Sequence, residues 1–205
     1  MTGCLLHLSA SPRGAQSQSR KAGAQFVRHL LAPGDLMLIR RDLGAEPPPA
    51  PGAAFIQASL AGDEARSAAD HDALAYSETL LDELERANLV VIDTPMHNFT
   101  LPAVLKAWID YVVRPNRSFG FSSRGKVPLL KNRPVRVIIA CGGRFSGPYP
   151  QQDFLTPYLR YVFGVIGLTD IEFLLLEQVI RAEGQAAAAL LAEDWIAKQI
   201  TLLAG

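Results

Sequence analysis

The sequence predicts an α/β fold in which a doubly wound, five-stranded parallel sheet carries helices on both faces. Two observations predict it: five short apolar runs alternate with longer amphipathic stretches, and each run is rich in Leu, Ile or Val. A chain of 205 residues, 49% of them hydrophobic, can bury one core but is short for two. We therefore expect a single domain over residues 1–205.

The apolar runs have the length of buried strands and are bounded by turn or charged residues. They cover Leu5 to Leu8, Leu36 to Ile39, Leu89 to Ile92, Val135 to Ala140 and Ile171 to Leu176. In a doubly wound sheet, ligands bind beyond the carboxyl ends of the strands, at the switch in strand order. The loops after Leu8, Ile92 and Ala140 are therefore expected to converge.

Apolar residues at helical spacing predict the helices that cover the sheet. The stripes are Ala22, Phe26 and Leu30; Ala73, Tyr76, Leu80 and Leu84; Leu105, Trp108 and Val112; and Ala189, Ala192, Ile196, Ile200 and Leu203. The segment Glu46 to Gly52 contains four prolines and cannot continue a helix or a central strand. Residues 53–70 follow it with mixed character, and we expect an irregular connection.

The first loop is rich in serine and leads into a helix expected to start near Arg20. Backbone N–H groups at a helix start, together with the hydroxyls of Ser11, Ser17 and Ser19, can hold a phosphate. The alternative is that Ser17 or Ser19 only caps the helix. No Gly-x-Gly-x-x-Gly occurs in the chain, so a cofactor with one phosphate fits better than tightly held NAD.

Two segments resemble motifs of other protein classes, but each departs from its motif at a position that the chemistry needs. Gly120 to Lys126 fits Gly-x-x-x-x-Gly-Lys, but Val127 replaces the magnesium-binding Ser or Thr, and no apolar strand precedes the segment. The segment Gly143 to Gly147 has its serine displaced from the hydrolase pattern Gly-x-Ser-x-Gly. A nucleotide triphosphatase and a Ser-His-Asp hydrolase are therefore disfavoured.

The loops after the third and fourth strands suit a flat heterocycle. Met96 and Phe99 can supply an apolar shelf, and the peptide between residues 97 and 98 can contact a ring edge. Gly142 and Gly143 permit close approach of backbone N–H groups. The alternatives are that the two apolar side chains plug the end of the sheet and that the glycines form a plain turn.

At these positions the chain resembles the FMN-dependent NADH-azoreductases, which also act as NAD(P)H:quinone reductases and have the flavodoxin-like fold. The motifs that carry the resemblance run through most of the chain. They are Ser11 with Ser17-Gln18-Ser19, Pro95-Met96-His97-Asn98-Phe99 with Leu105-Lys106, Phe119 to Phe121, Gly142-Gly143, Thr156 to Leu159 and Gly164 to Asp170.

The resemblance implies that the serine loop binds the FMN phosphate and that the other two loops hold the isoalloxazine. Carried over, the flavin-binding positions are Ser11, Ser17, Gln18, Ser19, Pro95, Met96, His97, Asn98, Phe99, Ala140, Cys141, Gly142 and Gly143. Two departures alter the flavin edge: His97 replaces the usual tyrosine, and Ala140-Cys141 replace a serine and a polar or basic residue. His97 is also a candidate for contact with the substrate.

The expected reaction passes two electrons from NADH or NADPH through the flavin to a quinone or azo compound, by a ping-pong sequence. No catalytic side chain and no metal are required. The resemblance also implies a homodimer with shared active sites. Phe119 and Phe121 lie in a polar, glycine-bearing segment, so we expect a partner surface and substrate to cover them, although both rings could instead fold onto their own domain.

The charge balance and the cysteine content limit the partners and the cellular compartment that we expect. Lys plus Arg and Asp plus Glu both number 20, so neither nucleic acid nor an anionic membrane is favoured as a partner. The same balance disfavours the alternative function, a flavodoxin-like electron-transfer module, which would carry an acidic docking surface. Cys4 and Cys141 lie in apolar strand-like contexts, and no signal peptide is seen, so a cytoplasmic protein with buried thiols is expected.

Overall fold

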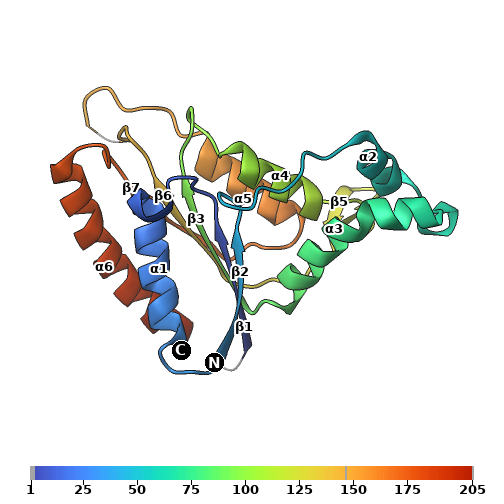
Figure 1. Ribbon diagram of the computed structural model, residues 1–205, viewed down its shortest axis with the longest axis horizontal. Coiled ribbons are helices and arrows are strands. Elements are labelled where there is room, and N and C mark those ends of the chain that lie inside the picture. Colours follow the sequence, from blue (N-terminus) through green and yellow to red (C-terminus); the bar gives the residue numbers. More distant parts are fainter. Residues whose placement is uncertain (1–2, 146, 205) are drawn as a thin grey trace.

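A computed structural model describes residues 3–145 and 147–204 of the chain. Its central element is a five-stranded parallel sheet in the order β2-β1-β3-β6-β7 (Figure 1). The strands are β1 (Gly3–Ser9), β2 (Leu36–Asp42), β3 (Leu89–Pro95), β6 (Val135–Ala140) and β7 (Ile171–Leu176). All five predicted strands are confirmed, and the order reverses direction between β1 and β3, which is the expected switch point.

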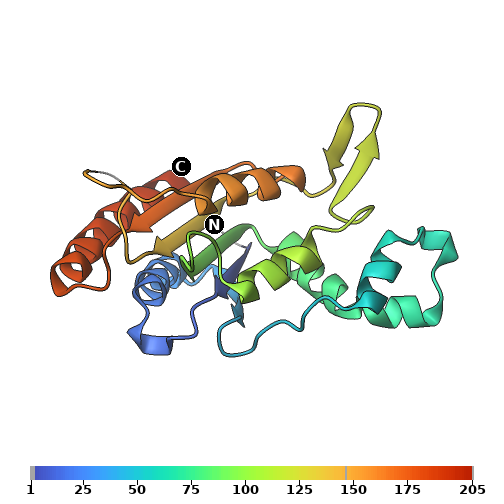
Figure 2. The ribbon, with the colours of Figure 1, turned by 90° about the horizontal axis from the view of Figure 1, so that it is seen from above.

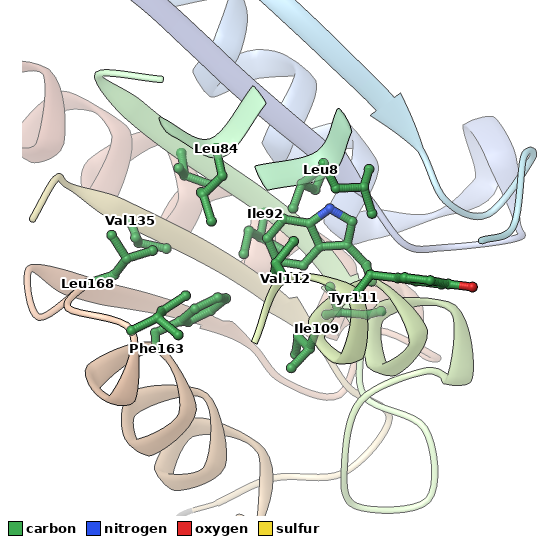
Figure 3. Packing of buried hydrophobic residues seen from close by; sticks show 14 of the residues in the cluster. Leu8, Leu84, Ile92, Ile109, Tyr111, Val112, Val135, Phe163 and Leu168 are labelled. Carbon is green, nitrogen blue, oxygen red and sulfur yellow. The ribbon is translucent and has the colours of Figure 1, made fainter. Parts of the chain in front are cut away.

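Helices cover both faces of the sheet, as the sequence predicts (Figure 1). The helices α1 (Gln18–Leu31) and α6 (Ala182–Ala204) pack on one face, and α3 (Ala68–Arg86), α4 (Ala103–Val112) and α5 (Leu155–Val165) pack on the other. Each helix buries one apolar stripe against the strands. Figure 3 shows this packing on the second face, where Ile92 and Val135 of the sheet lie near Val112 and Phe163 of the helices.

The central strands are continuously apolar because they lie in the interior of the sheet. All six residues of β6 are buried, and in β3 only the last residue is partly exposed, because both strands have a neighbour on each side and helices above and below. The outer strand β2 is half exposed, with Met37 at 61%. A parallel strand at the edge of a sheet has one side without a partner, which is why β2 carries more polar residues than its neighbours.

The expectation of an irregular connection is wrong for part of residues 53–70. Ala53–Leu60 forms α2, and Asp63–Ala65 forms a 3-10 turn, η2. The helix α2 has only two turns, and it buries Phe55 and Ala58 against the core that α3 and α4 share. Its eight residues are too few to show the apolar stripe that marks the longer helices, so tertiary packing decides its structure.

Two helical details also differ from the sequence prediction. Ala189 is exposed and Ala188 is buried in its place, so the α6 stripe starts one residue earlier. The apolar stripes predicted from the sequence do not include α5, although Leu155, Leu159 and Phe163 are fully or almost fully buried at four-residue spacing.

Residues 119–128 form an antiparallel hairpin of β4 (Phe119–Ser122) and β5 (Gly125–Pro128). Ser122 pairs with Gly125, which adopts a φ of +112° that an L side chain rarely tolerates. Figure 2 shows the hairpin standing away from the sheet and its helices. Among the described residues, no helix is long and apolar enough to cross a membrane.

Candidate functional site

The loops after β1, β3 and β6 lie together at the carboxyl edge of the sheet, as the topology predicts. Backbone hydrogen bonds join them directly beyond the strands: Ala10 N–H donates to Asp93 O over 2.9 Å, and Met96 N–H donates to Ala140 O over 2.8 Å. The three segments that carry the predicted flavin contacts therefore form one continuous surface.

The serine loop of the predicted phosphate site begins helix α1. Ser17 caps the helix by accepting a bond from Arg20 N–H over 3.4 Å, so the capping role is present. Its Oγ also lies 3.0 Å from Ser19 Oγ, and both serines and Ser11 are almost fully buried. Neutral hydroxyls gathered at a helix N-terminus, next to backbone N–H groups, form a donor set that suits a phosphate.

Arg20 fixes the shape of this loop from behind. Its Nε–H donates to Ser11 O over 2.7 Å, and its guanidinium forms a two-point ion pair with Asp42, one arm of which is 2.6 Å long. The hydrogen bond from Arg20 lowers the pKa of Asp42 below its ordinary value. Because Arg20 is engaged with Asp42 and with backbone, it is a positioning residue for the loop.

The segment after β3 makes a tight turn. His97 and Thr100 exchange two backbone hydrogen bonds of 2.8 and 3.0 Å, and the intervening Asn98 and Phe99 adopt φ values of +48° and +71°. Positive φ is unusual for a phenylalanine, and it holds the ring of Phe99 outward, with 54% of the residue exposed. Met96 is half-buried, so the loop presents an apolar surface with backbone N–H groups beside it.

The glycine loop after β6 leaves no room for larger residues. A Cβ on Gly143 would overlap the side-chain amide of Gln151, and a Cβ on Gly142 would overlap Ile180. Gln151 also donates from Nε2 to Met96 Sδ over 3.4 Å. Glycine lets the Gln151 and Ile180 side chains lie close against this loop, and a larger residue would displace the flexible ends of those side chains.

Ala140 and Cys141, the two departures from the family pattern, are both buried at the end of β6. The Cys141 thiol lies 3.4 Å from Gly143 O, and burial raises its pKa to about 11. The thiol thus stays protonated near neutral pH and is a poor nucleophile.

A cavity of about 590 Å³ opens beside the glycine loop and includes residues that the sequence interpretation missed. Besides Gly142 and Gly143, it is lined by Arg144, Tyr149, Gln151, Gln178, Ile180 and Arg181. They come from the loops after β6 and β7, which end at the same edge of the sheet. Gln178 lies just after the last predicted strand, and this position in the sequence is what could have identified it as a site residue.

Phe119 and Phe121 have different surroundings, and the expectation that a partner surface and substrate cover both rings is wrong for Phe119. Phe119 is 5% exposed and belongs to the core cluster of its own chain, as the alternative has it. Phe121 is 68% exposed, with its ring centroid 5.5 Å from that of Phe119. Only Phe121 is available to contact a substrate or a partner.

Comparisons with known proteins agree with this geometry. Residues 4–199 match the family model described as the flavodoxin-like fold. FMN-dependent NADH:quinone oxidoreductase 2 of Cupriavidus pinatubonensis is 51% identical over 181 residues, which are 87% of this chain and 88% of that protein.

Two solved structures share the architecture. The azoreductase AzrA superposes with a TM-score of 0.82 at 25% identity, covering 95% of this chain and 99% of that one. An FMN-dependent NADH-azoreductase of Bacillus anthracis, crystallised with FMN, has a TM-score of 0.81 at 21% identity and covers 97% and 99% of the two chains. The second likeness concerns the fold alone. By fold and by sequence, the chain belongs to the flavodoxin-like family, among the FMN-dependent NADH:quinone oxidoreductases.

Proposed function

We propose that the protein is an FMN-dependent oxidoreductase that passes two electrons from NADH or NADPH to quinones, and also to azo compounds. The observation that carries the proposal is the junction of three loops at the switch point of the sheet, each with the donor or apolar groups that one part of FMN needs. Relatives whose names state FMN, NADH and quinone support the cofactor, donor and acceptor.

The phosphate of FMN is held by Ser11, Ser17, Gln18 and Ser19. The described part of this loop offers hydroxyls and N–H groups and no carboxylate, so a dianion meets donors without repulsion. The positive end of the α1 dipole adds to the attraction. Arg20 keeps the loop in place without contacting the phosphate.

The ring system of FMN lies between residues 95–99 and residues 140–143. Met96 and Phe99 give it apolar contact, while the Asn98 and Gly143 N–H groups stabilise negative charge on its pyrimidine edge. When bound, FMN supplies the redox chemistry by accepting a hydride and later releasing two electrons. The side chains of the protein orient the ring and exclude water, and none of them acts as a nucleophile.

His97 is exposed at the turn, where the family usually has tyrosine. An imidazole at this place can donate to or accept from the cofactor or the substrate, depending on its protonation. We therefore assign His97 to contact with both the flavin and the acceptor.

We further propose a homodimer in which the hairpin of one subunit completes the active site of the other. The hairpin stands out from the domain and carries exposed apolar side chains, with Phe121 at 68%, Val127 at 40% and the adjoining Leu129 at 51% (Figure 2). Exposed apolar groups gathered on a projecting element are typical of an interface. A two-fold dimer repeats the arrangement in both sites.

Residues 1–205 work as one FMN-binding domain in this proposal, and the enzyme acts in the cytoplasm, where pyridine nucleotides are available. The two cysteines are buried and unpaired, as suits a reducing compartment. An electron-transfer module without its own acceptor is the alternative. The formal net charge of zero does not favour the acidic docking surface that such a module uses.

The purified protein should show the absorbance of bound flavin, bleach with NADH and recover when a quinone is added. Initial rates against both substrates should give parallel double-reciprocal lines, because donor and acceptor use the same slot in turn. Intersecting lines would rule out the shared slot. Failure to bind FMN at micromolar concentration would overturn the proposed function as a whole.

Replacement of the exposed aromatic, Phe121→Ala, should raise KM for quinones more than it changes the dissociation constant of FMN. Leu202→Ala on α6 is the control, since this exposed apolar side chain belongs to neither loop nor hairpin. Sedimentation should give a dimer. A monomer with full quinone activity would contradict the shared site.

A further inference from the structure

A second cavity, of about 500 Å³, is lined by helix α1, by strands β1 and β2 and by the part of the serine loop between Ser11 and Ser17. Its floor comes from His7 and Ser9 of β1, and its walls come from α1, from Arg40 on β2 and from the 3-10 turn η1 (Gly14–Gln16). It includes none of the residues assigned to FMN above. Arg20, which positions the serine loop, is the residue that the two sites share, and a ligand in this cavity would use other contacts than FMN.

Basic side chains surround this cavity. Arg20, Lys21 and Arg28 of α1 and Arg40 of β2 line it, and no carboxylate does. Arg20 is paired with Asp42, but within residues 3–145 and 147–204 the other three have no ion pair or side-chain hydrogen bond. Positive charges held close together in a molecule of zero net charge create a local field that attracts anions.

The floor of the cavity adds a buried polar group that lacks a second partner. His7 is 2% exposed, and its Nε2 lies 2.7 Å from Asp93 Oδ2, which also accepts a bond of 2.7 Å from Ser9 Oγ. A carboxylate only accepts hydrogen bonds, so His7 donates from Nε2–H. Its Nδ1 has no partner among the described residues and is the ring atom that remains for a ligand.

The basic side chains and the His7 ring suit different chemical groups of one ligand. The rim of Lys21, Arg28 and Arg40 suits a phosphate, whereas the unpartnered Nδ1 of His7 at the floor suits a hydroxyl, which can both donate and accept a hydrogen bond. The cavity volume lies in the range of sites that hold small organic molecules. We propose that this cavity binds a small phosphorylated polyhydroxy compound, with its phosphate at the basic rim and a hydroxyl on His7 Nδ1.

Calorimetry with ribose 5-phosphate on the FMN-loaded protein tests the rim, because bound FMN blocks the serine loop. The double substitution Arg28→Gln/Arg40→Gln should weaken binding at least about tenfold, through loss of two charge-assisted contacts. The flavin spectrum reports FMN occupancy separately and should not change. Arg86→Gln, an exposed arginine on α3, is the matched control and should bind as the parent does.

The floor is tested by nuclear magnetic resonance of protein with labelled histidine, which needs no substitution of a buried residue. Ribose 5-phosphate should shift the His7 Nδ1 resonance and leave His29 and His71 unchanged, and ribose alone should bind far more weakly. Equal affinity for inorganic phosphate and ribose 5-phosphate, with no response of His7, would refute the hydroxyl contact. No saturable binding, or equal weakening by Arg86→Gln, would overturn the site.

Discussion

Gln151 Nε2 donates to Met96 Sδ over 3.4 Å, and the same side-chain amide packs against the Cα of Gly143. One side chain thereby joins the loop after β3 to the loop after β6, the two segments proposed to hold the flavin ring. Gln151 is itself fixed by a backbone bond of 2.9 Å from its N–H to Arg144 O. The separation of the two loops consequently depends on a residue that neither motif contains.

The substitution Gly143→Ala should push the Gln151 side chain off Met96 and raise the FMN dissociation constant by about three- to tenfold. Stability should fall by less than about 1 kcal/mol, since the displaced group is the end of a flexible side chain. Titration of flavin fluorescence measures the affinity. In Gly143→Ala/Gln151→Ala the two effects should not add, because both act through one contact. Additive losses would show that Gln151 does not link the loops.

Phe99→Val should destabilise the protein by about 1 to 2 kcal/mol relative to Phe99→Gly. Both substitutions remove the ring, but a β-branched residue at a φ of +71° is strained and glycine is not. Urea unfolding of the two variants without FMN gives the difference. FMN affinity should fall by a similar factor in each, because the lost apolar contact is the same. Equal stabilities would mean that the turn relaxes to another conformation.

Ser19→Asp should lower FMN affinity at least about tenfold, because it replaces a donor by a charge of the same sign as the phosphate. Ser19→Ala, which removes the donor and adds no charge, should cost a smaller factor, about fivefold for one hydrogen bond. Thermal unfolding without FMN checks that both variants fold. Unchanged FMN affinity in folded Ser19→Asp would place the phosphate elsewhere.

The ion pair of Arg20 and Asp42 should make stability sensitive to acid. The pKa of Asp42 is lower in the folded chain than in the unfolded one, so unfolding takes up a proton as the pH falls. Its contribution is complete above about pH 4 to 5 and is lost as the pH drops through the folded pKa. Asp42→Asn should cost about 1 kcal/mol at neutral pH, and its loss of stability with acid should be shallower. If the stabilities of the parent protein and of Asp42→Asn fell in parallel as the pH is lowered, this assignment would be wrong.

Cys141 should resist alkylation in the native protein at about pH 8, because burial raises the pKa of its thiol to about 11 and keeps the reactive thiolate scarce. Cys4 is buried as well and is the internal comparison. Mass spectrometry after iodoacetamide treatment should find both thiols free in native protein and both modified in urea. Rapid native modification of Cys141 would mean that the end of β6 opens readily.

The five strands, most of the covering helices and the convergence of three loops at one edge of the sheet could be predicted from the order of residues. Apolar runs of strand length and helical stripes are local patterns, and the parallel order follows from their alternation. The resemblance to a known family added FMN, which the loops alone left open against simple capping and turn formation. Residues such as Ser17 and Gly143 could be singled out because their chemistry is visible without knowing their neighbours.

Only the tertiary structure decided which side chains support these loops and which are buried. Arg20 and Gln151 act on residues distant in sequence or in another element, and no local pattern reveals such partners. Phe119 and Phe121 look alike in the sequence, yet one packs into the core and the other is exposed, since alternate residues of a strand point to opposite faces. The helix α2 and the basic cavity over His7 likewise arise from packing between elements, which the order of residues does not display.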